Sequence, residues 1–250
     1  MTQTQIPPHE AIDLKATAQA FERVRTEVNK IVIGQPTVIE QILTALLGRG
    51  HCLLIGVPGL AKTVMAKAVA DALDMQFNRI QFTPDLMPSD MAYHTFIDEQ
   101  GRPRVEPGPV LRHGEALATF FFNEINRARP QVHSLLLRLM AERSMNAFNR
   151  EHHFPHLLVF ADRNRVEREE TFELPAAARD RFFMEIGIAA PETREARRAL
   201  MFDPKFHESH DFKIAKMTDK DLLYLQKDAI CFEVWGEIDD VEEADVAEAV

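Results

Sequence analysis

The sequence predicts an α/β fold in which a parallel sheet of five strands is flanked by helices. Short apolar runs alternate with amphipathic helical patterns between residues 51 and 188, and this alternation is typical of a parallel sheet with helices on both faces. The apolar runs are continuous, as expected for strands that are buried on both sides. A glycine-bearing loop follows the first run and opens a helix, which places the loop at the sheet edge where open α/β folds bind their ligands.

The composition of the 250-residue chain is that of a globular protein. Hydrophobic residues make up 46% and charged residues 27%, and no run of about 18 apolar residues predicts a transmembrane helix. The first ten residues lack a basic cluster followed by an apolar stretch, so no signal peptide is expected. Two cysteines cannot form a disulfide framework, which favours a reducing cytoplasm. The net charge of −10 disfavours nucleic acid and anionic lipid as partners.

Two helices are expected ahead of the sheet. Residues 11–31 carry apolar side chains at spacings of three and four, and residues 37–47 carry apolar pairs that recur every four residues. Glycine, glutamine and proline at 34–36 separate the two patterns.

The sheet region follows. The expected strands are residues 52–55, 77–82, 117–122, 157–160 and 182–188. Helices are expected over residues 62–73 and from Pro130 onward, because the missing N–H of proline costs nothing in a first helical turn. Residues 83–106 are rich in proline, aspartate and short polar turns, and we expect an insert with a hairpin there.

The loop after the first strand is the strongest candidate for a functional site. It reads Gly56, Val57, Pro58, Gly59, Leu60, Ala61, Lys62 and Thr63. Phosphate binding needs backbone N–H groups that point inward and a helix N-terminus that favours negative charge, and this loop offers both. Lys62 would reach the terminal phosphates of ATP, and the Thr63 hydroxyl would hold Mg²⁺. The alternative is a plain strand-to-helix turn with a capping lysine.

Ala61 departs from the strict pattern of such loops, which has glycine before the lysine. We expect alanine to be tolerated, because that residue enters the helix, where alanine is favourable. Its methyl group near the phosphates is the steric risk.

The chain resembles the MoxR group of AAA+ ATPases over roughly residues 20–230. The resemblance rests on residues 50–63, 79–90, 106–110, 123–130 and 174–182, which follow in the order of the family. The segment RIQFTPDLMPSD at 79–90 is the most diagnostic, because a generic ATPase does not need it.

The resemblance implies a domain organisation and a function. Residues 1–190 would form the AAA+ nucleotide-binding domain with its P-loop. Residues 191–250 would form a short, truncated helical lid. Residues 217–223 resemble the start of a lid helix, and an acidic stretch with seven acids follows from Glu237 onward. The protein would form a ring, expected to be a hexamer. It would use ATP to remodel or mature a partner protein, one candidate being a protein with a von Willebrand A-like domain.

The resemblance also assigns catalytic roles to three residues. Glu124 would polarise the attacking water, Asn164 would act as the polar sensor, and Arg181 would be the arginine finger that reaches the γ-phosphate of a neighbouring subunit. Asn123 and Asn164 follow predicted strands, where ligands of open α/β sheets bind.

Each of these residues also has a structural alternative. Glu124 could cap the following segment, and Asn164 could be an ordinary turn residue. Arg181 could pair with Asp180 or Glu185 in a surface network.

Asn123 stands where the family has an aspartate that organises the waters of Mg²⁺. An amide keeps the acceptor but loses the charge, so nucleotide binding should survive while turnover is low. The leading hypothesis is a MoxR-type ATPase that Asn123 slows. The rivals are a catalytically weak nucleotide-binding scaffold and, with less support, a small-molecule kinase built on the same loop.

Overall fold

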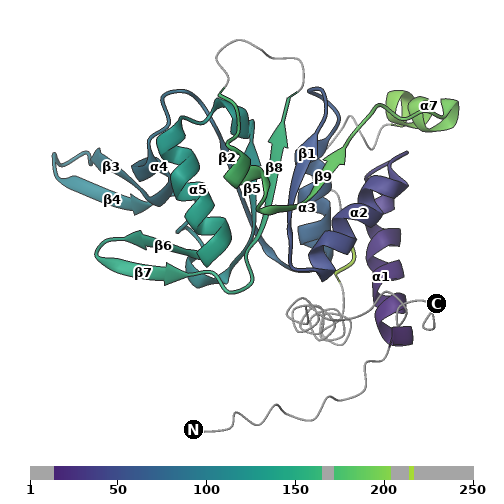
Figure 1. Ribbon diagram of the computed structural model, residues 1–250, viewed down its shortest axis with the longest axis horizontal. Helices are drawn as coiled ribbons and strands as arrows, with labels where there is room; N and C mark the ends of the chain where they lie inside the picture. Colours follow the sequence, from purple (N-terminus) through teal and green to yellow (C-terminus); the bar gives the residue numbers. More distant parts are fainter. Residues whose placement is uncertain (1–13, 165–171, 204–213, 217–250) are drawn as a thin grey trace, which may run out of the picture.

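The computed structural model describes residues 14–164, 172–203 and 214–216. A five-stranded parallel sheet in the order β2-β5-β8-β1-β9 forms the centre of the molecule (Figure 1). Its strands are β1 His51–Ile55, β2 Gln76–Gln81, β5 Leu117–Asn123, β8 Leu158–Arg163 and β9 Phe182–Gly187. The predicted α/β fold and the five predicted strands are therefore confirmed.

Helices cover both faces of the sheet (Figure 1). One face carries α1 Leu14–Asn29, α2 Pro36–Leu47 and α3 Lys62–Ala72; the other carries α4 Pro88–Ala92 and α5 Pro130–Glu142. Prolines begin α2, α4 and α5, where the first N–H has no helical partner in any case. The remaining helical segments are η1 Gly114–Ala116, η2 Ile125–Arg127, α6 Ala176–Arg179 and α7 Arg194–Phe202.

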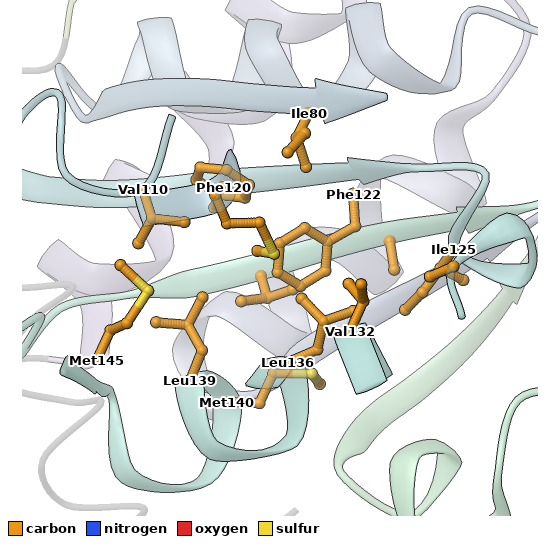
Figure 2. Close-up of a cluster of buried hydrophobic side chains, with 14 of the residues drawn as sticks. Ile80, Val110, Phe120, Phe122, Ile125, Val132, Leu136, Leu139, Met140 and Met145 are labelled. Carbon is orange, nitrogen blue, oxygen red and sulfur yellow. The ribbon is translucent and has the colours of Figure 1, made fainter. Parts of the chain in front are cut away.

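Alternation along the central strands divides the core into two layers. Phe120 and Phe122 of β5 pack against α5 in the layer that Figure 2 shows, while Phe121 packs in the opposite layer with α3. On β8, Val159 and Ala161 lie in the α5 layer, whereas Leu158 and Phe160 lie in the α3 layer. This explains why the strands read as continuous apolar runs in the sequence.

Two antiparallel hairpins project from the α5 side (Figure 1). β3 Tyr93–Ile97 and β4 Pro103–Pro107 form the first, which confirms the hairpin predicted within residues 83–106. β6 Ser144–Ala147 and β7 Arg150–His153 form the second.

The fourth strand is longer than predicted. The apolar run predicted a strand that ends at Phe160, yet β8 continues to Arg163. Leu54 and Ile55 of β1 pair with these two residues and hold them in the sheet. The error matters, because Asp162 becomes a buried strand residue rather than a loop residue.

Most of the predicted lid, including residues 217–223, and the acidic end lie outside the described residues, so the division at residue 190 stays a prediction. Within the described part, the side chain of Thr193 accepts a hydrogen bond from the Ala196 N–H and caps α7, which begins soon after that boundary. No helix in the described ranges is long and apolar enough to cross a membrane.

Candidate nucleotide-binding site

The predicted phosphate loop connects β1 to α3 at the carboxyl edge of the sheet. Gly56 is buried, and a Cβ atom there would lie 2.7 Å from the backbone oxygen of Ile188, so only glycine fits against the residue that follows β9. Gly59 has a positive φ of 83° and lies in open space, as a loop that can receive a ligand requires. Val57 and Pro58 are exposed beside it.

Ala61 does not enter the helix, so our reason for its tolerance is wrong. It precedes α3 in the left-handed conformation, with φ 56° and ψ 26°. For a residue with a Cβ atom this conformation costs about 1 kcal/mol or more. Glycine at this position in the strict pattern therefore relieves backbone strain, and alanine in this chain retains it.

Lys62 is buried at the first position of α3, with only 7% of its surface exposed. Its Nζ donates a hydrogen bond to the backbone oxygen of Gly56 at 2.8 Å and pairs with Asp162 Oδ2 at 2.9 Å. The amine thus lies at the base of the loop, beside a helix N-terminus that favours anions. A plain capping lysine would extend into solvent, which argues against the structural alternative.

Asp162 was not predicted as a site residue. It is 3% exposed, and its two carboxylate oxygens have different partners: Oδ2 faces Lys62, and Oδ1 accepts a hydrogen bond from the backbone N–H of Glu124. A carboxylate directly after an apolar strand was the available signal, because a charge at such a position needs a buried partner.

Asn123 ends the neighbouring strand β5, and Glu124 follows it. The amide nitrogen of Asn123 donates to Gln81 Oε1 on β2. Glu124 has a positive φ of 58°, and its carboxylate pairs with the Arg127 guanidinium. Its side chain makes no capping hydrogen bond to η2, so the capping alternative is wrong.

His133 of α5 supports the segment that follows Glu124. Its Nε2 lies 3.1 Å from the backbone oxygen of Ile125, to which it can donate. Burial lowers the pKa of His133 from its ordinary value, which keeps the ring neutral. A neutral ring and one N–H bond fix the turn on which the predicted catalytic glutamate lies.

Asn164 follows β8 at the same edge and is 5% exposed. The structure therefore gathers the loop over residues 56–63, the pair Asn123 and Glu124, and Asn164 at one edge of the sheet, as parallel strand directions require.

Arg181 lies at the other edge. Phe182 pairs with His51 at the start of β1, whereas the phosphate loop follows the end of that strand. Arg181 is exposed, and its guanidinium donates to the backbone oxygen of Ala177 at 3.1 Å. It therefore points to no part of the site that its own chain carries.

Within the described ranges, Arg181 forms no ion pair with Asp180 or Glu185, the two partners considered as alternatives. Glu185 pairs with Arg179 instead, at 2.7 and 2.9 Å, and among the described residues no ion pair joins Arg181 to Asp180. The structural alternative, in which Arg181 pairs with Asp180 or Glu185, is therefore wrong.

Comparison with known proteins places the part of the chain that carries this site in a known family. The family model for the ATPase family associated with various cellular activities (AAA) matches residues 51–184. Protein MoxR of Methylorubrum extorquens is 60% identical over 197 residues, which cover 79% of this chain and 57% of that protein. Chaperone MoxR1 of Mycobacterium tuberculosis is 41% identical over 198 residues, covering 78% of this chain and 51% of that protein.

A solved structure supports the same assignment. The crystal structure of a proposed ATPase from Cytophaga hutchinsonii superposes with a TM-score of 0.71 at 32% identity, covering 86% of this chain and 64% of that one. The chain spans a little more than half the length of the two MoxR proteins above. The family model covers more than half of this chain, from the first strand of the sheet to the last. The chain therefore belongs to the AAA family of ATPases and, within it, to the MoxR-type proteins.

Proposed function

We propose that this chain binds ATP with Mg²⁺ at the loop over residues 56–63 and hydrolyses it. One observation carries the proposal: the buried amine of Lys62 lies at the N-terminus of α3, where it contacts the loop oxygen of Gly56. Backbone N–H groups of the loop, the helix N-terminus and this amine are the three parts that hold the phosphates of a nucleotide. Family membership supports the choice of ATP.

The residues at the sheet edge fit a nucleotide-bound magnesium ion. Among the described residues no three His, Cys, Asp or Glu side chains gather into a metal site of their own, and Mg²⁺ in such enzymes takes most of its ligands from phosphates and water. Thr63 would supply a hydroxyl and Asn123 an amide oxygen. The ion would supply positive charge to the phosphate oxygens.

Three residues would act on the reaction. Glu124 accepts a hydrogen bond from the attacking water and orients it; its left-handed backbone turns it out of β5 at the edge where the loop lies. Asn164 offers an amide beside the γ-phosphate from the end of β8. Arg181 supplies positive charge to the γ-phosphate of a neighbouring subunit, because it lies at the far edge from the site of its own chain.

Such sharing of a site implies an assembly. We propose a ring, with a hexamer as the expected size, that remodels or matures a client protein in the cytoplasm; a von Willebrand A-like domain is one candidate client. The chaperone name of the Mycobacterium tuberculosis relative supports a client role. Residues 1–190 would form the nucleotide-binding domain and residues 191–250 the partial lid.

Calorimetry with ATP and Mg²⁺ tests the binding step. Lys62→Ala should weaken binding at least tenfold, about 1.4 kcal/mol, because a charge-assisted contact to phosphate is lost. Lys67→Ala is the matched control: it also removes an amine from α3, but Lys67 is exposed and pairs with Asp71. Equal affinities of the parent and Lys67→Ala are expected. Equal affinities of the parent and Lys62→Ala would refute the proposed site.

A nucleotide-binding scaffold with little turnover is the second candidate, and Asn123 is the observation that favours it. Its amide lacks the charge that family members place beside the metal, and its nitrogen is engaged with Gln81. If this candidate holds, Asn123→Asp raises the ATPase rate about tenfold or more. A parent that already turns over at about 1 per second, an ordinary rate for such enzymes, would contradict it.

A further inference from the structure

We propose that Asp162 supplies the metal-facing carboxylate that Asn123 lacks, a role that rests on the proposed binding of ATP and Mg²⁺. In this chain the carboxylate stands at Asp162, near the end of β8, and not at position 123, the end of the neighbouring strand β5. The metal dependence of nucleotide binding then comes from Asp162 and not from position 123.

The strand register places the two side chains together. Phe121 pairs with Phe160, and both lie in the α3 layer of the core. The pairing continues through Phe122 and Ala161, so the next residues, Asn123 and Asp162, are neighbours. Side chains two residues apart on a strand share a face, and adjacent strands lie about 4.8 Å apart. Asn123 and Asp162 therefore share the face on which Lys62 begins α3.

The negative charge of Asp162 would lose its counter-charge when nucleotide binds. In the absence of nucleotide its charge is balanced by Lys62 at 2.9 Å. The phosphates of ATP attract the same amine, and Asp162 would then keep only the backbone N–H of Glu124. A buried carboxylate without a counter-charge is costly. A divalent cation that arrives with the nucleotide restores the balance at the same place.

Asn123 is poorly suited to that task. Its oxygen is neutral, and its nitrogen is held by Gln81 on the side away from β8. Asp162, by contrast, touches both the phosphate-binding lysine and the backbone of Glu124. One carboxylate thus connects the phosphate loop, the metal and the residue that orients the water.

The test measures how far Mg²⁺ strengthens binding of a non-hydrolysable ATP analogue to the full chain, as the ratio of affinities in Mg²⁺ and in EDTA. We expect a ratio of at least ten for the parent and of less than three for Asp162→Asn. The double variant Asn123→Asp with Asp162→Asn moves the carboxylate back to β5 and should restore a ratio of at least five. Asp71→Asn, which removes an exposed carboxylate from α3, should match the parent. Circular dichroism checks that each variant is folded.

If Asp162→Asn does not fold, the single variant Asn123→Asp still decides the question. Asp162 remains in that variant, so the added carboxylate should change the ratio of affinities in Mg²⁺ and in EDTA less than threefold. A tenfold rise in Asn123→Asp, or an unchanged ratio in a folded Asp162→Asn, would overturn the proposal. If the parent binds the analogue equally in Mg²⁺ and in EDTA, only the role of Asp162 is refuted. If the parent binds the analogue in neither buffer, the proposed function is refuted as well.

Discussion

The pair formed by Lys62 and Asp162 should contribute to the stability of the protein without nucleotide, so Lys62→Met should destabilise the fold. The two charges lie 2.9 Å apart, with side-chain exposures of 7% and 4%. At an effective dielectric constant of 20 their attraction is about 6 kcal/mol, part of which offsets the cost of burying them. Removal of one partner from a buried pair typically costs about 3–5 kcal/mol. Asp162 keeps the Glu124 N–H, so we expect the lower end, about 3 kcal/mol.

Urea denaturation at pH 7.5 in the absence of nucleotide measures this cost. The double variant Lys62→Met with Asp162→Asn leaves no uncompensated charge and should recover about 2 kcal/mol relative to the sum of the single variants. Lys67→Met, which breaks the exposed pair with Asp71, should cost less than about 0.5 kcal/mol. A loss of less than about 1 kcal/mol in Lys62→Met, or strictly additive single variants, would show that the buried pair does not stabilise the fold.

Three further predictions concern backbone strain and protonation. Ala61→Gly should raise the free energy of unfolding by about 1 kcal/mol, because it relieves a left-handed alanine; a fall in the urea midpoint would contradict the strain. Gly56→Ala should lower the thermal midpoint by several degrees, because its Cβ atom would lie 2.7 Å from the Ile188 oxygen; an unchanged midpoint would show that β9 yields easily. Burial lowers the pKa of His51 and of His133 below the ordinary 6.5, so the folded protein holds both rings neutral while the unfolded chain takes up protons below that pH. The urea midpoint should therefore be level above pH 6.5 and fall from 6.5 towards 5, and a midpoint that rises on acidification would exclude this linkage.

His51 shows why the protonation effect is structural. Its Nδ1 accepts the backbone N–H of Val159 at 3.0 Å, and its Nε2 lies 3.1 Å from the backbone oxygen of Met140. Only the neutral ring can accept and donate in this way. Protonation therefore breaks a bond between β1 and β8, the two strands that carry the phosphate loop and Asp162.

The sequence was sufficient to predict the sheet, because its strands are continuous apolar runs bounded by turn residues. The phosphate loop could be predicted for a related reason: glycine, lysine and threonine stand at fixed positions between such a strand and a helix. Both features are local, and local patterns survive in the sequence without knowledge of the partners.

The partners across the sheet could not be predicted in the same way. Asp162 and Lys62 are separated by 100 positions in the chain, and only the register of β1 with β8 brings them together. The conformation of Ala61 also escaped prediction, because alanine is compatible with both a helix start and a turn. Arg181 illustrates the reverse case: its place in the sequence suggested a role, and its position at the far edge of the sheet restricts that role to a neighbouring subunit.

The proposed active site is shared between subunits, and a mixing experiment with two inactive variants can demonstrate the sharing. Arg181→Ala removes the arginine offered to the neighbour, and Glu124→Gln removes the group that orients water in the subunit's own site. Each variant alone should hydrolyse ATP far more slowly than the parent, while Arg179→Ala, which alters an adjacent arginine, should stay close to the parent. Mixed assemblies contain interfaces with both an intact Glu124 and an intact Arg181, so the mixture should regain part of the parent rate. A mixture that stays at the sum of its two components, with an active parent, would contradict a shared site.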